Sequence, residues 1–275
     1  MKEHMTEHEN PVWSGEQQAA RAAVADYEAA LDDFLGHGAA RTVDLLALQP
    51  GERVLDVACG TGAAALRAAA HVRPGGQVTG IDLSPLMIAT AGEKARARGL
   101  ENMSWRTGDM ARLDFPDNSF DAVMCVLGLF FAQDMVAQAA ELWRVVQPGG
   151  RLTVTTLGRE WFAPLDSVFT AAVATIAPGT AQDYAPARTS DPAIVADILS
   201  AAGIPGVTIS SETYNLPLRA PADWWRVVMG TGLRRTVLAM EAEAVARVRA
   251  HNEAWIVDNG VAAVELGFIY AVAVK

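Results

Sequence analysis

Short apolar runs alternate with Ala-rich helical stretches through residues 45–157 of the chain. The apolar runs predict five strands, at Arg53–Ala58, Val78–Leu83, Met103–Thr107, Phe120–Leu127 and Arg151–Thr156. The stretches between them predict helices at residues 63–71, 84–98 and 135–146, each followed closely by Gly or Pro. Because Phe120–Leu127 is apolar nearly throughout, we expect it to be a central strand covered on both faces. Strands that alternate with helices predict an α/β fold with a doubly wound, parallel sheet.

The pattern changes after Leu157. Residues 192–202 predict a helix, residues 207–213 a sixth strand and residues 266–274 a closing strand. Residues 159–190 are rich in aromatic and small residues, and residues 215–262 are mostly helical in pattern. We interpret both as helical insertions into a core domain of residues 45–275. The pattern of residues 1–44 predicts a helical segment that acts as a lid, with a break in the helix near Gly36-His37-Gly38.

The composition and charge exclude several classes of function. The chain is 51% hydrophobic and 20% charged, and no apolar run reaches the roughly 18 residues that a membrane span needs. The formal net charge of −10 does not favour a partner that is itself polyanionic, so we expect no nucleic acid. Arg234 and Arg235 are interpreted as part of a solvated helix face. The chain has only two cysteines, too few for a disulfide framework, which favours a location in the cytoplasm. The protein could also form a homo-oligomer.

A glycine-rich loop follows the first predicted strand, in the order Val54-Leu55-Asp56-Val57-Ala58-Cys59-Gly60-Thr61-Gly62. Glycines let the backbone approach a ligand closely, and the next helix presents its N-terminus to a negative group. The spacing alone also fits a nicotinamide dinucleotide fingerprint, with Asp82 about twenty residues on. Asp56 favours another cofactor, since a carboxylate there repels a pyrophosphate and attracts the ammonium of an aminoacyl group.

The loop resembles motif I of the class I S-adenosylmethionine-dependent methyltransferases, in the form seen in the UbiE-like small-molecule subgroup. Ala58 stands where the usual motif has its first glycine. Gly80-Ile81-Asp82-Leu83-Ser84, Gly108-Asp109-Met110, residues 117–123 and residues 142–150 resemble the later motifs in order. The resemblance covers residues 45–157 and implies a Rossmann-like, seven-stranded sheet, mostly parallel with an antiparallel last strand and helical lid insertions.

The resemblance also implies cofactor contacts. Asp82 would accept from the ribose hydroxyls and Asp109 from the adenine amine, with the backbone of Met110 at the ring edge. Leu83 and Met87 could sandwich the adenine or could be plain core. The expected cofactor-binding residues are Asp56, Ala58, Gly60, Thr61, Gly62, Asp82, Leu83, Met87, Gly108, Asp109, Met110 and Cys125, with Cys125 contributing its carbonyl.

The catalytic groups are less evident. Neither cysteine has a basic neighbour in sequence, so we interpret Cys59 and Cys125 as buried thiols. Methyl transfer needs alignment and exclusion of water more than acid–base chemistry. His37 and His251 are the candidate bases, although surface positions are the simpler interpretation of both. We expect no metal.

Aromatic residues are interleaved through the segments that could cover the sheet edge, and they suggest an apolar or aromatic acceptor. Phe130, Phe131, Trp161 and Tyr27 are the candidate acceptor contacts. The sequence therefore predicts methyl transfer to a natural-product or quinone-like metabolite. A methyltransferase-like protein that catalyses a non-methylating rearrangement, or acts as a scaffold, is the alternative.

Overall fold

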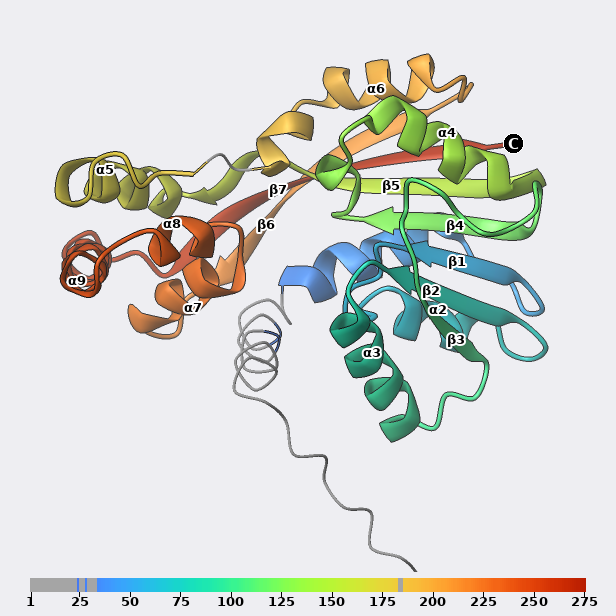
Figure 1. The fold of residues 1–275 in the computed structure, drawn as a ribbon, viewed down its shortest axis with the longest axis horizontal. Helices are drawn as coiled ribbons and strands as arrows, with labels where there is room; N and C mark the ends of the chain where they lie inside the picture. Colours follow the sequence, from blue (N-terminus) through green and yellow to red (C-terminus); the bar gives the residue numbers. More distant parts are fainter. Residues whose placement is uncertain (1–23, 25–27, 29–33, 183–184) are drawn as a thin grey trace, which may run out of the picture.

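A seven-stranded sheet of order β3-β2-β1-β4-β5-β7-β6 forms the backbone of the molecule (Figure 1). The computed structural model describes residues 24, 28, 34–182 and 185–275. The strands are β1 Arg53–Val57, β2 Gln77–Asp82, β3 Met103–Thr107, β4 Phe120–Val126, β5 Val146–Ala163, β6 Thr208–Pro217 and β7 Ala263–Val274. β1 to β5 pair in parallel, and β7 pairs antiparallel with both β5 and β6. The predicted mostly parallel sheet is confirmed, with β7 as the antiparallel strand.

Helices cover both faces of the core half of the sheet (Figure 1). They are α2 Ala65–His71, α3 Pro85–Ala97, α4 Met135–Val145 and α6 Pro192–Ala201, with the short 3-10 helices η1 Leu129–Phe131 and η2 Ala185–Thr189. α4 and α6 pack on one face of the sheet, and α2 with residues 34–46 packs on the other. The predicted break at Gly36-His37-Gly38 is wrong, because residues 34–46 form continuous helix. Thr42 Oγ1 lies 2.7 Å from Thr155 Oγ1 on β5 and fixes this helix to the sheet.

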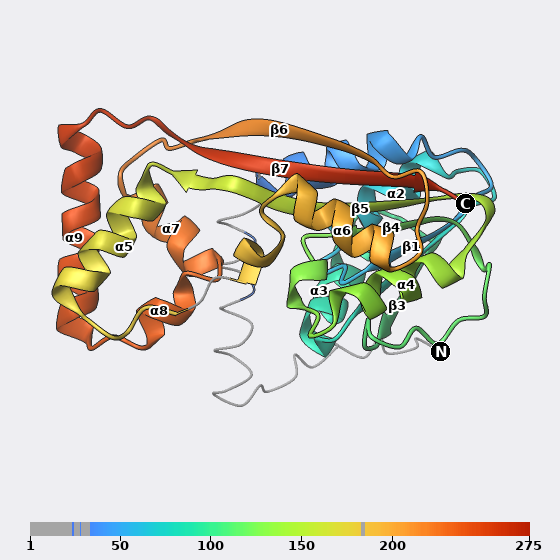
Figure 2. The same cartoon turned by 90° about the horizontal axis from the view of Figure 1, so that it is seen from above.

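β5, β6 and β7 are long, and they carry the sheet out of the core into a second lobe (Figures 1 and 2). The helical lobe consists of α5 Leu165–Ile176, α7 Ala222–Gly230, α8 Arg234–Leu238 and α9 Ala242–Asp258. Its core holds Trp224, whose indole Nε1 donates to Asn252 Oδ1 at 2.8 Å, both side chains being buried. The fifth strand was predicted to end at Thr156, but β5 continues to Ala163. The reason is that Leu157 and Phe162 of this extension are buried in the hydrophobic core of the helical lobe.

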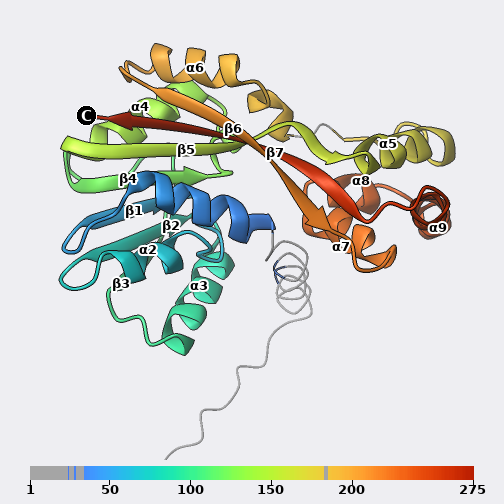
Figure 3. The ribbon, with the colours of Figure 1, turned by 180° about the vertical axis from the view of Figure 1, so that it is seen from behind.

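The sheet narrows where it leaves the core (Figure 3). The pairing of β5 with β7 shifts between Leu157 and Trp161 and again between Trp161 and Ala163. Beside the first shift, Gly158 and Gly267 face each other so closely that a Cβ on Gly158 would lie 3.2 Å from the Cα of Gly267. We call this crossing, formed by Gly158 and Gly267, the neck.

Among the described residues no helix is long and apolar enough to cross a membrane.

Candidate active site

The carboxyl ends of β1, β2 and β4 meet at one edge of the sheet, where the strand order turns from β2 through β1 to β4. Ligands of open α/β sheets bind at such a switch point. A cavity of about 780 Å³ lies there. Its wall includes the loop after β1, the end of β2, residues 108–111, residues 126–128 after β4 and the start of α4. We call this the donor cavity.

Asp56 stands at the end of β1 with its carboxylate buried under the loop, and only 1% of the residue is exposed. Its Oδ2 accepts a hydrogen bond of 3.0 Å from Ala65 N, in the first turn of α2. Its Oδ1 has no partner among the described residues. Burial, with a smaller contribution from the charge of Asp82, raises the pKa of Asp56 to about 8. A cation in the cavity would relieve this cost.

Asp82, at the end of β2, joins the loop to the next helix. Its Oδ2 accepts from Gly60 N and its Oδ1 from Ser84 N, both at 2.9 Å. Ser84 caps α3, its Oγ accepting from Met87 N at 3.4 Å. Asp82 therefore holds the glycine loop in place as well as lining the donor cavity.

Ala58 has a φ of 58°, in the left-handed region that favours glycine. This conformation explains why the usual motif has glycine at the position. Its methyl group packs against Gly128, because a Cβ on Gly128 would lie 2.6 Å from the Cβ of Ala58. The lack of a side chain at Gly128 thus leaves space for the methyl group of Ala58 in the loop after β1.

Gly128→Ala is expected to destabilise the fold by about 1–3 kcal/mol through this overlap. Ala58→Gly in the same chain should recover part of the loss, because it removes the overlapping methyl group. The free energies of unfolding of the two single variants and the double variant test the coupling. Strictly additive losses would contradict the contact.

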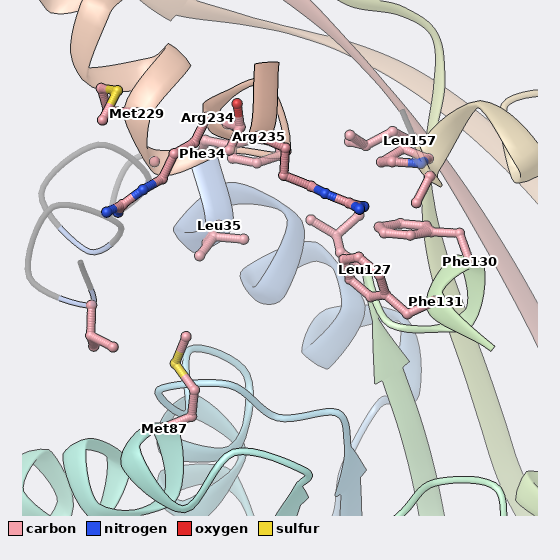
Figure 4. Close-up of a pocket in the computed structure, with 16 residues that line it drawn as sticks. Phe34, Leu35, Met87, Leu127, Phe130, Phe131, Leu157, Met229, Arg234 and Arg235 are labelled. Atoms are coloured by element: carbon pink, nitrogen blue, oxygen red, sulfur yellow. The ribbon is translucent and has the colours of Figure 1, made fainter. Parts of the chain in front are cut away.

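A second cavity of about 350 Å³ adjoins the first (Figure 4). Four residues line both: Leu35, Met87, Leu127 and Phe131. The rest of its described wall is Val24, Phe34, Phe130, Leu157, Ala185, Pro186, Met229, Gly230, Thr231, Gly232, Arg234 and Arg235. The helical lobe, η1 and the N-terminal residues Val24, Phe34 and Leu35 therefore line an apolar space beside the donor cavity. We call it the acceptor cavity.

Arg188 ties the segment before α6 to η1. Its guanidinium donates to the carbonyls of Phe130 at 2.9 Å, Ala132 at 2.7 Å and Gln133 at 3.3 Å. These carbonyls belong to the turn that presents Phe130 and Phe131 to the acceptor cavity. Arg188 is thus a positioning residue for one wall of that cavity.

Comparison with known proteins agrees with this geometry. Residues 54–150 match a family model described as a methyltransferase domain. The nocamycin O-methyltransferase of Saccharothrix syringae is 36% identical over 208 residues, which are 71% of this chain and 74% of that protein. The chain belongs to the S-adenosylmethionine-dependent methyltransferases.

Two further likenesses are informative. The demethylmenaquinone methyltransferase of Listeria welshimeri is 40% identical over 111 residues, which are 40% of this methyltransferase and 47% of that relative. This match thus spans about half the length of the relative. The crystal structure of the [4+2]-cyclase SpnF is 25% identical, with a TM-score of 0.52 over 97% of this chain and 85% of that one. The same fold therefore also occurs in a protein named for a cyclisation.

S-adenosylmethionine is the cofactor of this methyltransferase, and the polar groups of the donor cavity fit it. Asp56 Oδ1 is a buried acceptor with no described partner, as an ammonium group requires. Gln138 on α4 is 2% exposed, and neither polar atom of its amide has a partner among the described residues. Buried polar groups are nearly always paired, so both side chains point to a ligand. Membership of the methyltransferase family rules against the alternative interpretation of the glycine loop as a nicotinamide dinucleotide site.

Sequence reasoning overlooked Gln138. The signal was present: Gln138 stands in the apolar stripe of α4, whose other buried members are Ala139, Leu142 and Val145. A lone amide in such a stripe indicates a polar partner from outside the helix.

The methyltransferase brings most of the predicted cofactor residues together. Those that line the donor cavity are Asp56, Ala58, Gly60, Thr61, Asp82, Leu83, Met87, Gly108, Asp109 and Met110. Gly62 and Cys125 do not line it. The position that a Cβ of Gly62 would take faces Trp105, at 2.8 Å. The side chain of Cys125 is buried in the core on the α4 side of the sheet, and Val126, Leu127 and Gly128 line the cavity after it. Leu83 is 72% exposed at the rim, so it is not core.

The candidate bases and acceptor contacts of the methyltransferase are more scattered. Phe130 and Phe131 line the acceptor cavity, while Trp161 pairs with Leu266 across the sheet and lines neither cavity. His251 is exposed on α9, away from both cavities. Tyr27 lies outside the described residues.

His37 is engaged elsewhere in the methyltransferase. Its Nε2 lies 2.5 Å from Glu212 Oε1, and its ring stacks on Tyr214 with centroids 4.2 Å apart. Tyr270 OH also donates to Glu212 Oε1, at 2.8 Å. His37 lines neither cavity, so the structure gives no support to a catalytic role for it.

The two thiols of the methyltransferase are buried, in agreement with their interpretation from sequence. Burial raises the pKa of Cys125 to about 12 and moves that of Cys59 further in the same direction. The charge of Asp56 adds to both shifts. Neither group is a thiolate nucleophile at neutral pH.

Proposed function

We propose that this methyltransferase methylates a small, largely apolar molecule held in the acceptor cavity. The shared wall of the two cavities carries the proposal, since it places an apolar space directly beside the donor site. The relatives named for nocamycin and demethylmenaquinone support an acceptor of this kind. The two free, buried thiols support a reducing compartment such as the cytoplasm.

In this proposal, Asp56 pairs with the ammonium of the cofactor, Asp82 accepts from its ribose, and Asp109 and Met110 meet its adenine. Asp109 is exposed, and its Oδ1 already accepts from Ala111 N at 2.9 Å, which fixes the turn. The cofactor supplies a methyl group already activated on a sulfonium. The chain contributes alignment and exclusion of water through Leu35, Leu127 and Phe131.

Gln138 is assigned to the cofactor by the same reasoning, and Gln138→Leu tests the assignment. The variant should bind S-adenosylhomocysteine several-fold more weakly. The ligand-free protein should become more stable, by about 1 kcal/mol, because two buried polar atoms without partners are removed. Calorimetric titration and urea denaturation measure the two effects. Loss of stability together with unchanged affinity would contradict the assignment.

Catalysis without methyl transfer is the second candidate. The likeness to SpnF favours it, as does a described acceptor-cavity wall with no histidine, acid, lysine, tyrosine or cysteine to accept a proton. Incubation of candidate acceptors with methyl-labelled cofactor distinguishes the two. Label in the product with one S-adenosylhomocysteine per turnover supports methyl transfer, and product formed with no loss of cofactor supports the alternative.

A further inference from the structure

Arg234 and Arg235 are the charged residues in the described wall of the acceptor cavity, and no acid accompanies them. Their pattern in the sequence favours a solvated helix face. The structure agrees in that Arg235 is exposed and Arg234 half-buried, and it adds that both residues border the acceptor cavity. An otherwise apolar cavity therefore carries positive charge, in a chain whose formal net charge is −10.

The two arginines point in different directions. Figure 4 shows the side chain of Arg235 extending toward Leu127, which also lines the donor cavity, while that of Arg234 extends to the opposite side. Arg235 is the one directed at the place where an acceptor would meet the donor.

Within the described part of the chain, Arg235 also has no counter-ion. No acid among the described residues lies within ion-pair distance of it, whereas two other arginines of the helical lobe, Arg226 and Arg249, are paired. Arg226 Nη1 lies 3.0 Å from Asp223 Oδ1, and Arg249 Nε lies 2.7 Å from Glu253 Oε1. Arg235 is an exposed guanidinium at the border of an apolar cavity, with no side-chain partner among the described residues. Such a group can bind a carboxylate or a similar oxygen anion.

We propose that the acceptor is an organic anion, an apolar body that carries an ionised oxygen acid, and that Arg235 binds the anionic group. The inference rests on the proposed function and names its substrate class. It also accounts for the lack of a proton acceptor in the described cavity wall. A group that is already ionised has no proton to be removed by the protein.

A pair of fluorescent probes of similar shape tests the inference in the full chain with saturating S-adenosylhomocysteine. The anionic probe is 8-anilinonaphthalene-1-sulfonate and the neutral probe is N-phenyl-1-naphthylamine. We expect Arg235→Gln to weaken binding of the anion by roughly fivefold or more, and of the neutral probe by less than about twofold. Arg235→Lys should keep part of the preference.

Two variants serve as controls. Arg247→Gln removes the same charge from an exposed position on α9 and should change neither affinity. Met229→Trp fills the acceptor cavity and should weaken both probes, which locates them there.

The possible failures are distinguishable. If both probes bind and respond to Met229→Trp, but Arg235→Gln affects them equally or not at all, the anion inference is wrong and the proposed function stands. If Met229→Trp changes the binding of neither probe, the cavity does not receive apolar molecules. That result would contradict the proposed function itself.

Discussion

Asp56→Asn is expected to weaken the binding of S-adenosylhomocysteine by roughly 10- to 100-fold. The carboxylate is buried, and its Oδ1 has no partner among the described residues. A charge-assisted hydrogen bond made there by an ammonium is worth about 1.5–3 kcal/mol. Asparagine keeps the shape and an acceptor oxygen but loses the charge. Isothermal titration calorimetry measures the difference.

The same residue should make both stability and binding depend on pH. Its pKa is about 8 in the folded protein, against an ordinary value of 3.8. The folded state thus holds the proton more tightly, so the free energy of unfolding should fall as pH rises from 4 to 8. The slope is at most about 1.4 kcal/mol per pH unit, and the curve flattens above 8. Cofactor binding favours the ionised form, so affinity should rise over the upper part of that range with release of a proton.

Asp56→Asn should remove this contribution from both pH profiles, while Asp197→Asn on the exposed side of α6 should leave them as they are. Calorimetry in buffers of different ionisation enthalpy counts the protons released on binding. An Asp56→Asn variant with the same proton release as the unchanged chain would contradict the assignment.

Gly80→Val is expected to destabilise the protein by about 3 kcal/mol, at the upper end of the range for overpacking. Gly80 on β2 pairs with Trp105 on β3. A Cβ on Gly80 would lie 2.4 Å from Cζ3 and 2.5 Å from Cε3 of Trp105. The indole would have to leave its place over Gly62, so the cofactor loop should loosen too. Urea denaturation measures the stability, and S-adenosylhomocysteine titration the effect on the loop.

Trp105→Leu provides the matched test of this contact. Alone it should destabilise the protein through lost packing. Combined with Gly80→Val it should cost less than the sum of the two single losses, because the smaller side chain makes room for valine. A double variant that loses the full sum would place the cause of the Gly80→Val effect elsewhere.

The sequence predicted the donor half of the molecule well because its constraints are local. Asp56 and Asp82 lie at the carboxyl ends of strands that show clear apolar runs, Gly60 lies in the loop after the first of them, and parallel strands bring their carboxyl ends together. Ser84-Pro85 was correctly predicted to open a helix, since a cap and a first-turn proline act within one turn.

The acceptor half could not be predicted in the same way. Its cavity is lined by residues from the N-terminal segment, η1, η2, α7 and α8, whose meeting depends on how far β5 to β7 run past the core. Arg235 is exposed on α8, and only the folded chain shows that it borders the same cavity as Leu127. Similarly, His37 looks available as a base until Glu212, 175 positions away, is found beside it.

The neck is a position at which the helical lobe could be exchanged for that of a related enzyme. Three strands pass through it, and the donor cavity lies wholly on the core side. The lobe beyond Gly158 and Gly267 can therefore change its length, its aromatic content and its charges without moving Asp56 or Asp82. A chimera that exchanges both excursions of the chain, from β5 to η2 and from β6 to β7, would keep the donor cavity of one parent and receive the lobe side of the acceptor cavity, with Met229 and Arg235, from the other. The neck thus lies between the part of the enzyme that binds the methyl donor and the lobe that completes the acceptor cavity.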